Sequence, residues 1–460
     1  MAHSIMSQDA GSWLSGRVGI VRLRQLTDQL RHRLSFVPLL YALGATLFVQ
    51  IMLYIDRSMS DVDLPVLMTT TVDSARSVFS AISGGLITSI TLLLSMMLVA
   101  VQLASSQFSP RTLRDWLGDR VLQHTVGLVL GTTVFCLLGL RATRSFTDEG
   151  SSSTVPHLTV LVALVLGVAS LIGVVRSVDH ITHSVRIGSV AQRIANDTIT
   201  AIRAGDTLRA GQRPSVLPGQ PPTSGQLDPP LDEIPNDARA VEAPVAGWLQ
   251  QIDDDTILSA LPDDSTGYVT APLGGFTPKH APIMWISPPP DDDAECLQQV
   301  LEAFAFGDTR TMQQDVAFGL LQLSDVAVRA LSPGINDPST ANDLIVHIGN
   351  VLLAIWEQPT PEATTADGTR SLVRHQPTHR EFLDQAYASV RRYASGDPHV
   401  LGTMVHTLQT VRSEVQRRDL PGPVEPIDDF LDEFASWGDR GAWTELEGER
   451  LEDLVARKSG

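Results

Sequence analysis

The chain has little cysteine, few aromatic residues and no excess of basic charge. Its two cysteines are Cys136, inside an apolar run, and Cys296, so we expect neither a disulfide framework nor a thiolate metal site. The 34 Lys and Arg residues are outnumbered by 52 Asp and Glu residues, which gives a net charge of −18. This acidic balance argues against a nucleic-acid partner, because such binding needs a basic surface.

Sequence patterns of catalysis are missing as well. The sequence shows no phosphate-binding glycine loop and no recognisable pairing of a nucleophile with a base. Asp179 and His183 are four residues apart and could in principle hold a metal, but a solvated helix face explains them more simply. We therefore expect no enzyme activity, no cofactor and no metal site.

Charged residues are absent from the middle of four apolar runs. Each run approaches the roughly 20 residues needed to cross about 30 Å of hydrocarbon. Arginines are concentrated before the first run, between the second and third, and after the fourth, which predicts that both termini are cytoplasmic. The four predicted spans are Phe36 to Ile55, Val78 to Leu103, Gln123 to Leu140, and Leu158 to Val178.

The predicted fold is mainly α: a four-helix transmembrane domain followed by a cytoplasmic α+β region. A partly amphipathic pattern continues after the fourth span, and a Pro- and Gly-rich stretch without periodicity follows. Short β-like runs and then helical periodicity complete the chain. The predicted segments are an N-terminal segment (1–35), the transmembrane domain (36–180), a juxtamembrane helix (181–210), a linker (211–240), a small β-barrel or sandwich (241–290) and a helical bundle (291–460).

The second span carries a line of small and polar residues. At 100° per residue they lie within about 40° of one line along the helix. Close helix packing or hydrogen bonds to the helix's own carbonyls would explain them; alternatively, they line a water-filled pore, with Leu98 as a constriction. The predicted pore-lining residues are Ser80, Gly84, Thr88, Thr91, Ser95, Leu98, Gln102 and Ser106.

The pore interpretation sets the expected mechanism and partners. No Asp, Glu or Lys lies inside the four runs, and none of the runs has a charged residue in its middle, where coupled carriers usually place one. Passive conduction therefore fits better than pumping, with a slight preference for cations because the soluble region is acidic. Four spans are too few to enclose a pore alone, so we expect a cyclic homo-oligomer surrounded by membrane lipid.

A distinctive turn, "RALSPGINDPSTAND", lies in the helical region. Gly334 can adopt the left-handed conformation that ends a helix, and Asp337 can cap the next helix with Pro338 at its first position. A functional interpretation instead uses these polar side chains as a cation or ligand site. That candidate site consists of Asn336 and Asp337 with Asp315 or Asp325.

Several motifs together resemble a known family. "QLASSQFSPR", "GTTVFCLLGLRA" and "ALSPGINDP" are similar to bacterial predicted membrane proteins grouped as domain of unknown function 2254. The resemblance covers about Ser35 to Arg418. The family typically has Gln-Asp-Pro where this chain has Gln314-Asp315-Val316, and Tyr where it has Trp248. The resemblance implies a bacterial inner-membrane protein, but no activity or ligand.

Two functions remain at this point. The first is a homo-oligomeric inner-membrane ion channel, in which the second span lines the pore and the soluble region regulates it. The alternative is a membrane-anchored sensor or assembly scaffold, whose transmembrane bundle is dry. The length of the polar line favours the channel.

Overall fold

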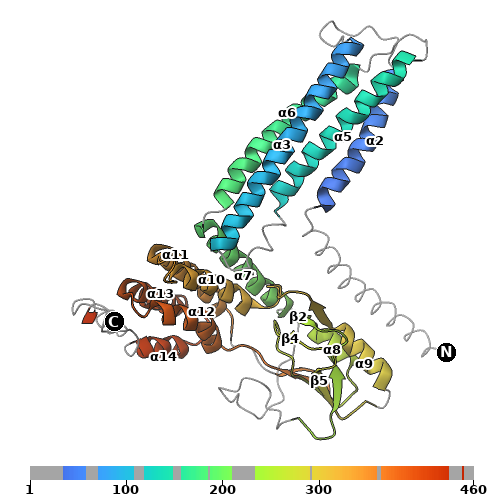
Figure 1. Cartoon of the computed structure of the whole chain (residues 1–460). Helices are drawn as coiled ribbons and strands as arrows, with labels where there is room; N and C mark the ends of the chain where they lie inside the picture. Colours follow the sequence, from blue (N-terminus) through green and yellow to red (C-terminus); the bar gives the residue numbers. More distant parts are fainter. Residues whose placement is uncertain are drawn as a thin grey trace, which may run out of the picture. The chain divides into compact units, whose positions relative to one another are not determined.

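The computed structural model describes residues 35–58, 71–107, 119–148, 157–184, 187–209, 234–290, 293–359, 364–434 and 448–449. The chain divides into two compact units, Met1–Arg186 and Ile187–Gly460. Figure 1 shows the long helices of the first unit and the mixed helices and strands of the second. Each unit is described by itself below.

The first unit contains four long helices in its described residues. Four segments are long and apolar enough to cross a membrane: Phe36–Ser58, Val72–Leu103, Arg120–Thr143 and His157–His183. They confirm the four predicted spans and extend most of them by a few residues. The helices are α2 (Phe36–Ser58), α3 (Val72–Gln107), α5 (Arg120–Asp148) and α6 (His157–Ser184).

Helix α5 is the central element of this bundle and packs against α2, α3 and α6. Its apolar segment is 61% buried, against 17% to 28% for the other three. Glycines on α5 allow the close approach: a Cβ at Gly127 would lie 2.7 Å from the Tyr41 ring, and one at Gly139 would lie 2.9 Å from the Phe79 ring. The core therefore requires small residues on α5.

Aspartate carboxylates bind the backbone N–H groups at the start of two of these helices. The Asp56 carboxylate, at the end of α2, accepts hydrogen bonds from the backbone N–H groups of Leu158 (2.9 Å) and Thr159 (3.0 Å) at the start of α6. Asp119 accepts the Val121 N–H at 2.9 Å. Each carboxylate satisfies donors that a helix start leaves without an intrahelical partner.

The second unit begins with α7 (Ile187–Arg209), which packs against α10 and α11. Val190, Ile194 and Thr198 on α7 are buried, and a Cβ at Gly319 of α10 would lie 2.0 Å from the Thr198 hydroxyl. The predicted juxtamembrane helix is thus a core helix of the second unit. The other helices are α8 (Asp254–Ala260), α9 (Asp293–Glu302), α10 (Val316–Ala330), α11 (Pro338–Trp356), α12 (His379–Ala394), α13 (Pro398–Arg418) and α14 (Glu425–Phe434).

The strands form two open sheets. In the first sheet, in the order β1-β5-β3-β8-β7, β3 and β8 are parallel and the other pairs antiparallel. The second sheet has the antiparallel order β4-β2-β6. The strands are β1 (Arg239–Glu242), β2 (Gly247–Ile252), β3 (Thr266–Val269), β4 (Phe276–Thr277), β5 (Pro282–Ser287), β6 (Phe304–Gly307), β7 (Thr364–Asp367) and β8 (Arg370–Arg374).

This arrangement corrects the closed barrel that the sequence suggested for residues 241–290. Both sheets keep open edges, and β6, β7 and β8 come from later in the chain. The region predicted as a helical bundle (291–460) also contains strands, because α9 ends at Glu302 and β6 begins at Phe304. Pairing between distant strands depends on contacts that a local hydropathy pattern does not contain.

Candidate functional site

The predicted pore-lining positions lie on the outward surface of α3. Every described one of them is exposed, from Ser80 to Gln102, whereas Phe79, Leu86 and Leu93 on the opposite side are buried. The side chain of Ser106 lies outside the described part. The structure therefore keeps the polar line together and directs it away from the core of its own bundle.

The hydroxyls on this surface bond to their own helix. Thr88 donates to the Gly84 carbonyl (3.1 Å), Thr91 to Ile87 (2.9 Å) and Ser95 to Thr91 (2.8 Å). This is the back-bonding expected of Ser and Thr in membrane helices. A Cβ at Gly84 would meet no atom within 4 Å. Among the described residues of the protomer, none would pack against a side chain added at Gly84.

A second set of hydroxyls lies inside the bundle, and none of these residues was predicted to belong to a site. Thr132 of α5 and Ser170 of α6 are buried with their oxygens 3.0 Å apart, and Ser177 donates to Thr125 at 2.7 Å. Thr125 and Thr132 on α5 are seven residues apart, and so are Ser170 and Ser177 on α6. This spacing is a sequence signal that could have predicted the contact between the two helices, which we call the seam. The seam is a dry contact between α5 and α6.

Ionisable groups stand at one end of the same seam. His180 Nε2 lies 2.7 Å from an Asp119 carboxylate oxygen, and the predicted pair of His183 and Asp179 has a separation of 3.4 Å on an exposed face. Among the described residues, no group of three His, Cys, Asp or Glu side chains could hold a metal ion. The contacts found here are pairwise.

The ligand-site candidate Asp315 is a buried helix cap. Its carboxylate accepts the Phe318 N–H at 3.1 Å, and its two oxygens accept hydrogen bonds from Nε and Nη2 of Arg310. Gly274 has φ of +74°, and a Cβ there would collide with the carboxylate. These contacts explain Asp315 by structure alone.

The other three candidates lie at the far end of α10 or along it. Asp337 caps α11 by accepting the Thr340 N–H (3.1 Å) and hydroxyl (2.6 Å), as predicted, and these hydrogen bonds lower the pKa of Asp337. Asn336 is exposed with φ of +50°, whereas Gly334 is not left-handed, contrary to expectation. Asn tolerates this conformation because its short polar side chain bonds locally. Asp325 is half-buried on α10.

These candidates do not form one cluster. Asp315 precedes α10 and Asp337 follows it, so 15 helical residues lie between them, a rise of about 22 Å. A ligand role for either end of α10 remains a prediction.

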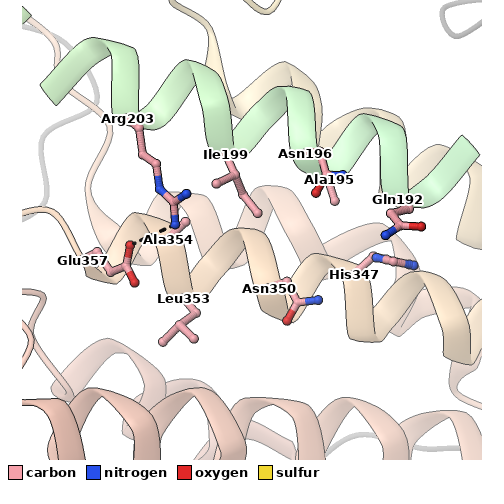
Figure 2. A pocket seen from close by; sticks show the side chains of 10 residues that line it. All are labelled: Gln192, Ala195, Asn196, Ile199, Arg203, His347, Asn350, Leu353, Ala354 and Glu357. Atoms are coloured by element: carbon pink, nitrogen blue, oxygen red, sulfur yellow. Dashed lines mark ion pairs between the residues drawn. The ribbon is translucent and has the colours of Figure 1, made fainter. Parts of the chain in front are cut away.

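An open groove between α7 and α11 has a volume of about 270 Å³. Figure 2 shows Gln192 of α7 facing His347 of α11 at one end, and Arg203 facing Glu357 at the other. Ile199 and Leu353 lie between the two ends. No sequence pattern predicts this groove, because two helices that are adjacent only in space leave no local signal in the sequence.

Comparison with known proteins identifies a family that matches most of this chain. The family described as "Predicted membrane protein (DUF2254)" matches residues 31–410, in agreement with the resemblance noted from the motifs. "Uncharacterized protein Rv1290c" of Mycobacterium tuberculosis and "Uncharacterized protein Mb1321c" of Mycobacterium bovis are each 29% identical over 348 residues, or 73% of this chain. The match spans only 63% of each relative's length. No solved structure gives a significant match.

Proposed function

We propose that this chain, which belongs to the DUF2254 family of predicted membrane proteins, forms a homo-oligomeric ion channel in the bacterial inner membrane. In this assembly, α3 of each copy faces the central axis, and both termini are cytoplasmic. The observation that carries the proposal is the exposure of the polar line on the surface of the protomer. A polar line turned inward would have been explained by packing within one copy.

The interior of a single copy offers little room for a path. Phe79, Phe135 and Leu93 have no exposed surface, and four of the buried hydroxyls between α5 and α6 are paired with one another. Aromatic and aliphatic side chains that fill a bundle exclude water. Conduction therefore requires a space between copies, which a cyclic assembly with α3 at its axis provides.

The hydrogen bonds of the line also bear on which ions pass. A hydroxyl has one proton to donate and two lone pairs to accept. Because Thr88, Thr91 and Ser95 each donate that proton to their own helix, their oxygens present lone pairs outward. A row of acceptors replaces the hydration of cations better than that of anions, so we propose cations as the conducted species.

Ion flux into proteoliposomes tests the proposal. Leu98→Trp should reduce cation flux by at least about tenfold, because an indole at the narrowest part of the axis blocks it. Leu43→Trp on α2 is a matched control, since Leu43 and Leu98 are 63% and 60% exposed in the protomer. Equal flux through wild type and Leu98→Trp, with the oligomer intact, would contradict the channel.

A dry scaffold is the second candidate, and the same back-bonds favour it. Hydroxyls that are satisfied by their own helix need no water, and Gly84 leaves space for another backbone to approach. In that case Leu98→Trp should separate the copies, and wild-type vesicles should conduct no ions. Oligomer mass measured beside flux distinguishes the two functions.

A further inference from the structure

The groove between α7 and α11 has a charged end built around Glu357. One Glu357 oxygen accepts Arg418 Nη2 at 2.7 Å, and the other lies 3.7 Å from Arg203 Nη2. Glu357 is thus held in place while its pairing across the groove is longer than a hydrogen bond. The Arg203 side chain is 67% exposed, so a ligand can reach both charges.

The opposite end is lined by three amide side chains and a histidine. Gln192, Asn196 and Asn350 are exposed, and His347 is half-buried. In the described part of the chain, no other residue forms a hydrogen bond with these four side chains. Figure 2 shows them on facing sides of the two helices. Amides both donate and accept, so this end suits a ligand with an amide or hydroxyl group.

The middle and the size of the groove limit the ligand further. Ile199, Leu353 and Ala354 form a short apolar floor, which fits a few methylene groups. The volume of about 270 Å³ lies just below the range of roughly 300 to 1,000 Å³ found for drug-sized ligands. A small molecule with a charged head, a short aliphatic body and a polar end matches this order of surfaces.

The charges select a zwitterion. Arg203 and Glu357 face each other, one positive and one negative, so a carboxylate and an ammonium on adjacent atoms of a ligand each find an opposite charge. Arg418 contacts one oxygen of Glu357, which leaves the other oxygen for the cation of a ligand; a dicarboxylate or a nucleotide would instead bring a further negative charge to that oxygen. Like charges at short distance cost free energy.

We propose that this groove binds a free amino acid with a polar side chain. The α-carboxylate pairs with Arg203, the α-ammonium pairs with Glu357, and the side chain bonds to the amides of Asn196 and Asn350. A ligand bound in this way contacts both α7 and α11, which already pack against each other. The proposal concerns the second unit only and does not depend on conduction by the first.

Isothermal titration of the full-length protein in detergent with L-glutamine tests the proposal. Wild type should bind L-glutamine. Arg203→Gln should weaken its Kd by at least about tenfold, because it removes a charge-assisted pair. Arg417→Gln is the matched control, since Arg417 is 69% exposed, pairs with Glu414 and lies outside the groove; its Kd should equal that of wild type.

Two glutamine derivatives test the proposal with the wild-type protein alone, so the result does not depend on whether a variant folds. Glutaminamide lacks the carboxylate and N-acetylglutamine lacks the ammonium, so both should bind much more weakly than L-glutamine. Absence of L-glutamine binding at millimolar concentration would overturn the proposal. So would equal binding of the derivatives, an unchanged Kd in Arg203→Gln, or binding of AMP or succinate in place of the amino acid.

Discussion

The outward surfaces of α2 and α3 differ, although both helices are equally little buried in the bundle, at 17% each. Helix α2 presents large apolar side chains, among them Leu39, Leu43 and Leu47, each more than 60% exposed. Helix α3 presents hydroxyls, glycine and Gln102 along its line. Lipid tails accept the first surface readily, whereas the second gains nothing from them.

The borders of the line on α3 add to this difference. At 100° per residue, Ile87 and Leu94 lie on one side of it and Leu92 and Val99 on the other, and all four are exposed. The surface therefore has a narrow polar centre between apolar edges. Low burial within the bundle therefore occurs with two kinds of surface: the exposed face of α2 is apolar, as lipid tails favour, whereas the exposed face of α3 carries the polar line on which the proposed contact between copies depends.

The largest expected effect separates inner from outer surfaces. Gly139→Leu should prevent the bundle from forming its core, because even a Cβ would lie 2.9 Å from Phe79, and overpacking costs about 1–3 kcal/mol or more. Loss of monodisperse protein in detergent checks this outcome. Gly84→Leu is the matched variant on the exposed face and should remain folded. A well-folded Gly139→Leu protein would show that the core is looser than described.

The second-largest expected effect is on oligomer formation, which compares the exposed faces of α2 and α3 directly. Gly84→Leu on α3 should abolish or strongly reduce the oligomer, because the branched side chain holds a second helix away. Gly44→Leu on α2 is the control, since neither glycine has an atom within 4 Å of an added Cβ. Native mass spectrometry reports the oligomer. If both variants assemble like wild type, the exposed faces of α2 and α3 do not differ in their role in assembly.

Cross-linking sharpens the same comparison without disturbing the helix. Thr91→Cys on α3 should form disulfide-linked dimers under mild oxidation, because copies around an axis bring this position together. Leu47→Cys on α2 should remain monomeric on a denaturing gel. Cys136 is fully buried but Cys296 is half-buried, so both variants are made in a Cys296→Ser background. Equal cross-linking at both positions would mean that α3 does not face its neighbours preferentially.

The smallest expected effect is on the free energy of unfolding, when a buried hydroxyl and an exposed hydroxyl are removed in turn. Thr132→Val removes the contact with Ser170 and should lower the free energy of unfolding by about 0.6 kcal/mol, the average for such bonds in a membrane protein. Thr91→Val removes only a bond to its own helix, so it should change the stability of the protomer less. Denaturation in mixed micelles measures both. A larger cost for Thr91→Val would show that this hydroxyl stabilises the protomer.

Local features of the structure followed from the sequence, while features that join distant residues did not. The Asp337 cap was predictable because Asp, Pro338 and Thr340 act within one turn. The positions of β6 and β8 were not, because each strand pairs with residues about 55 or more positions earlier. The left-handed residue of the turn was assigned to Gly334, but Asn336 adopts this conformation, since local preference alone does not fix which residue bends.

The candidate sites divide in the same way. The line on α3 was readable because helical periodicity places those residues on one face whatever surrounds them. The α7–α11 groove was not readable, since Arg203 and Glu357 meet only after two helices pack.

By itself, the sequence determined that four segments are long and apolar enough to cross a membrane and that one of them carries a polar line, because length, apolarity and helical periodicity are local properties of the chain. Only the tertiary structure decided that this line faces outward, that a second set of hydroxyls joins α5 to α6, and that α7 belongs to the core of the second unit. The physical reason is that the direction in which a helix face points is set by the neighbours it buries, and those neighbours come from distant parts of the chain.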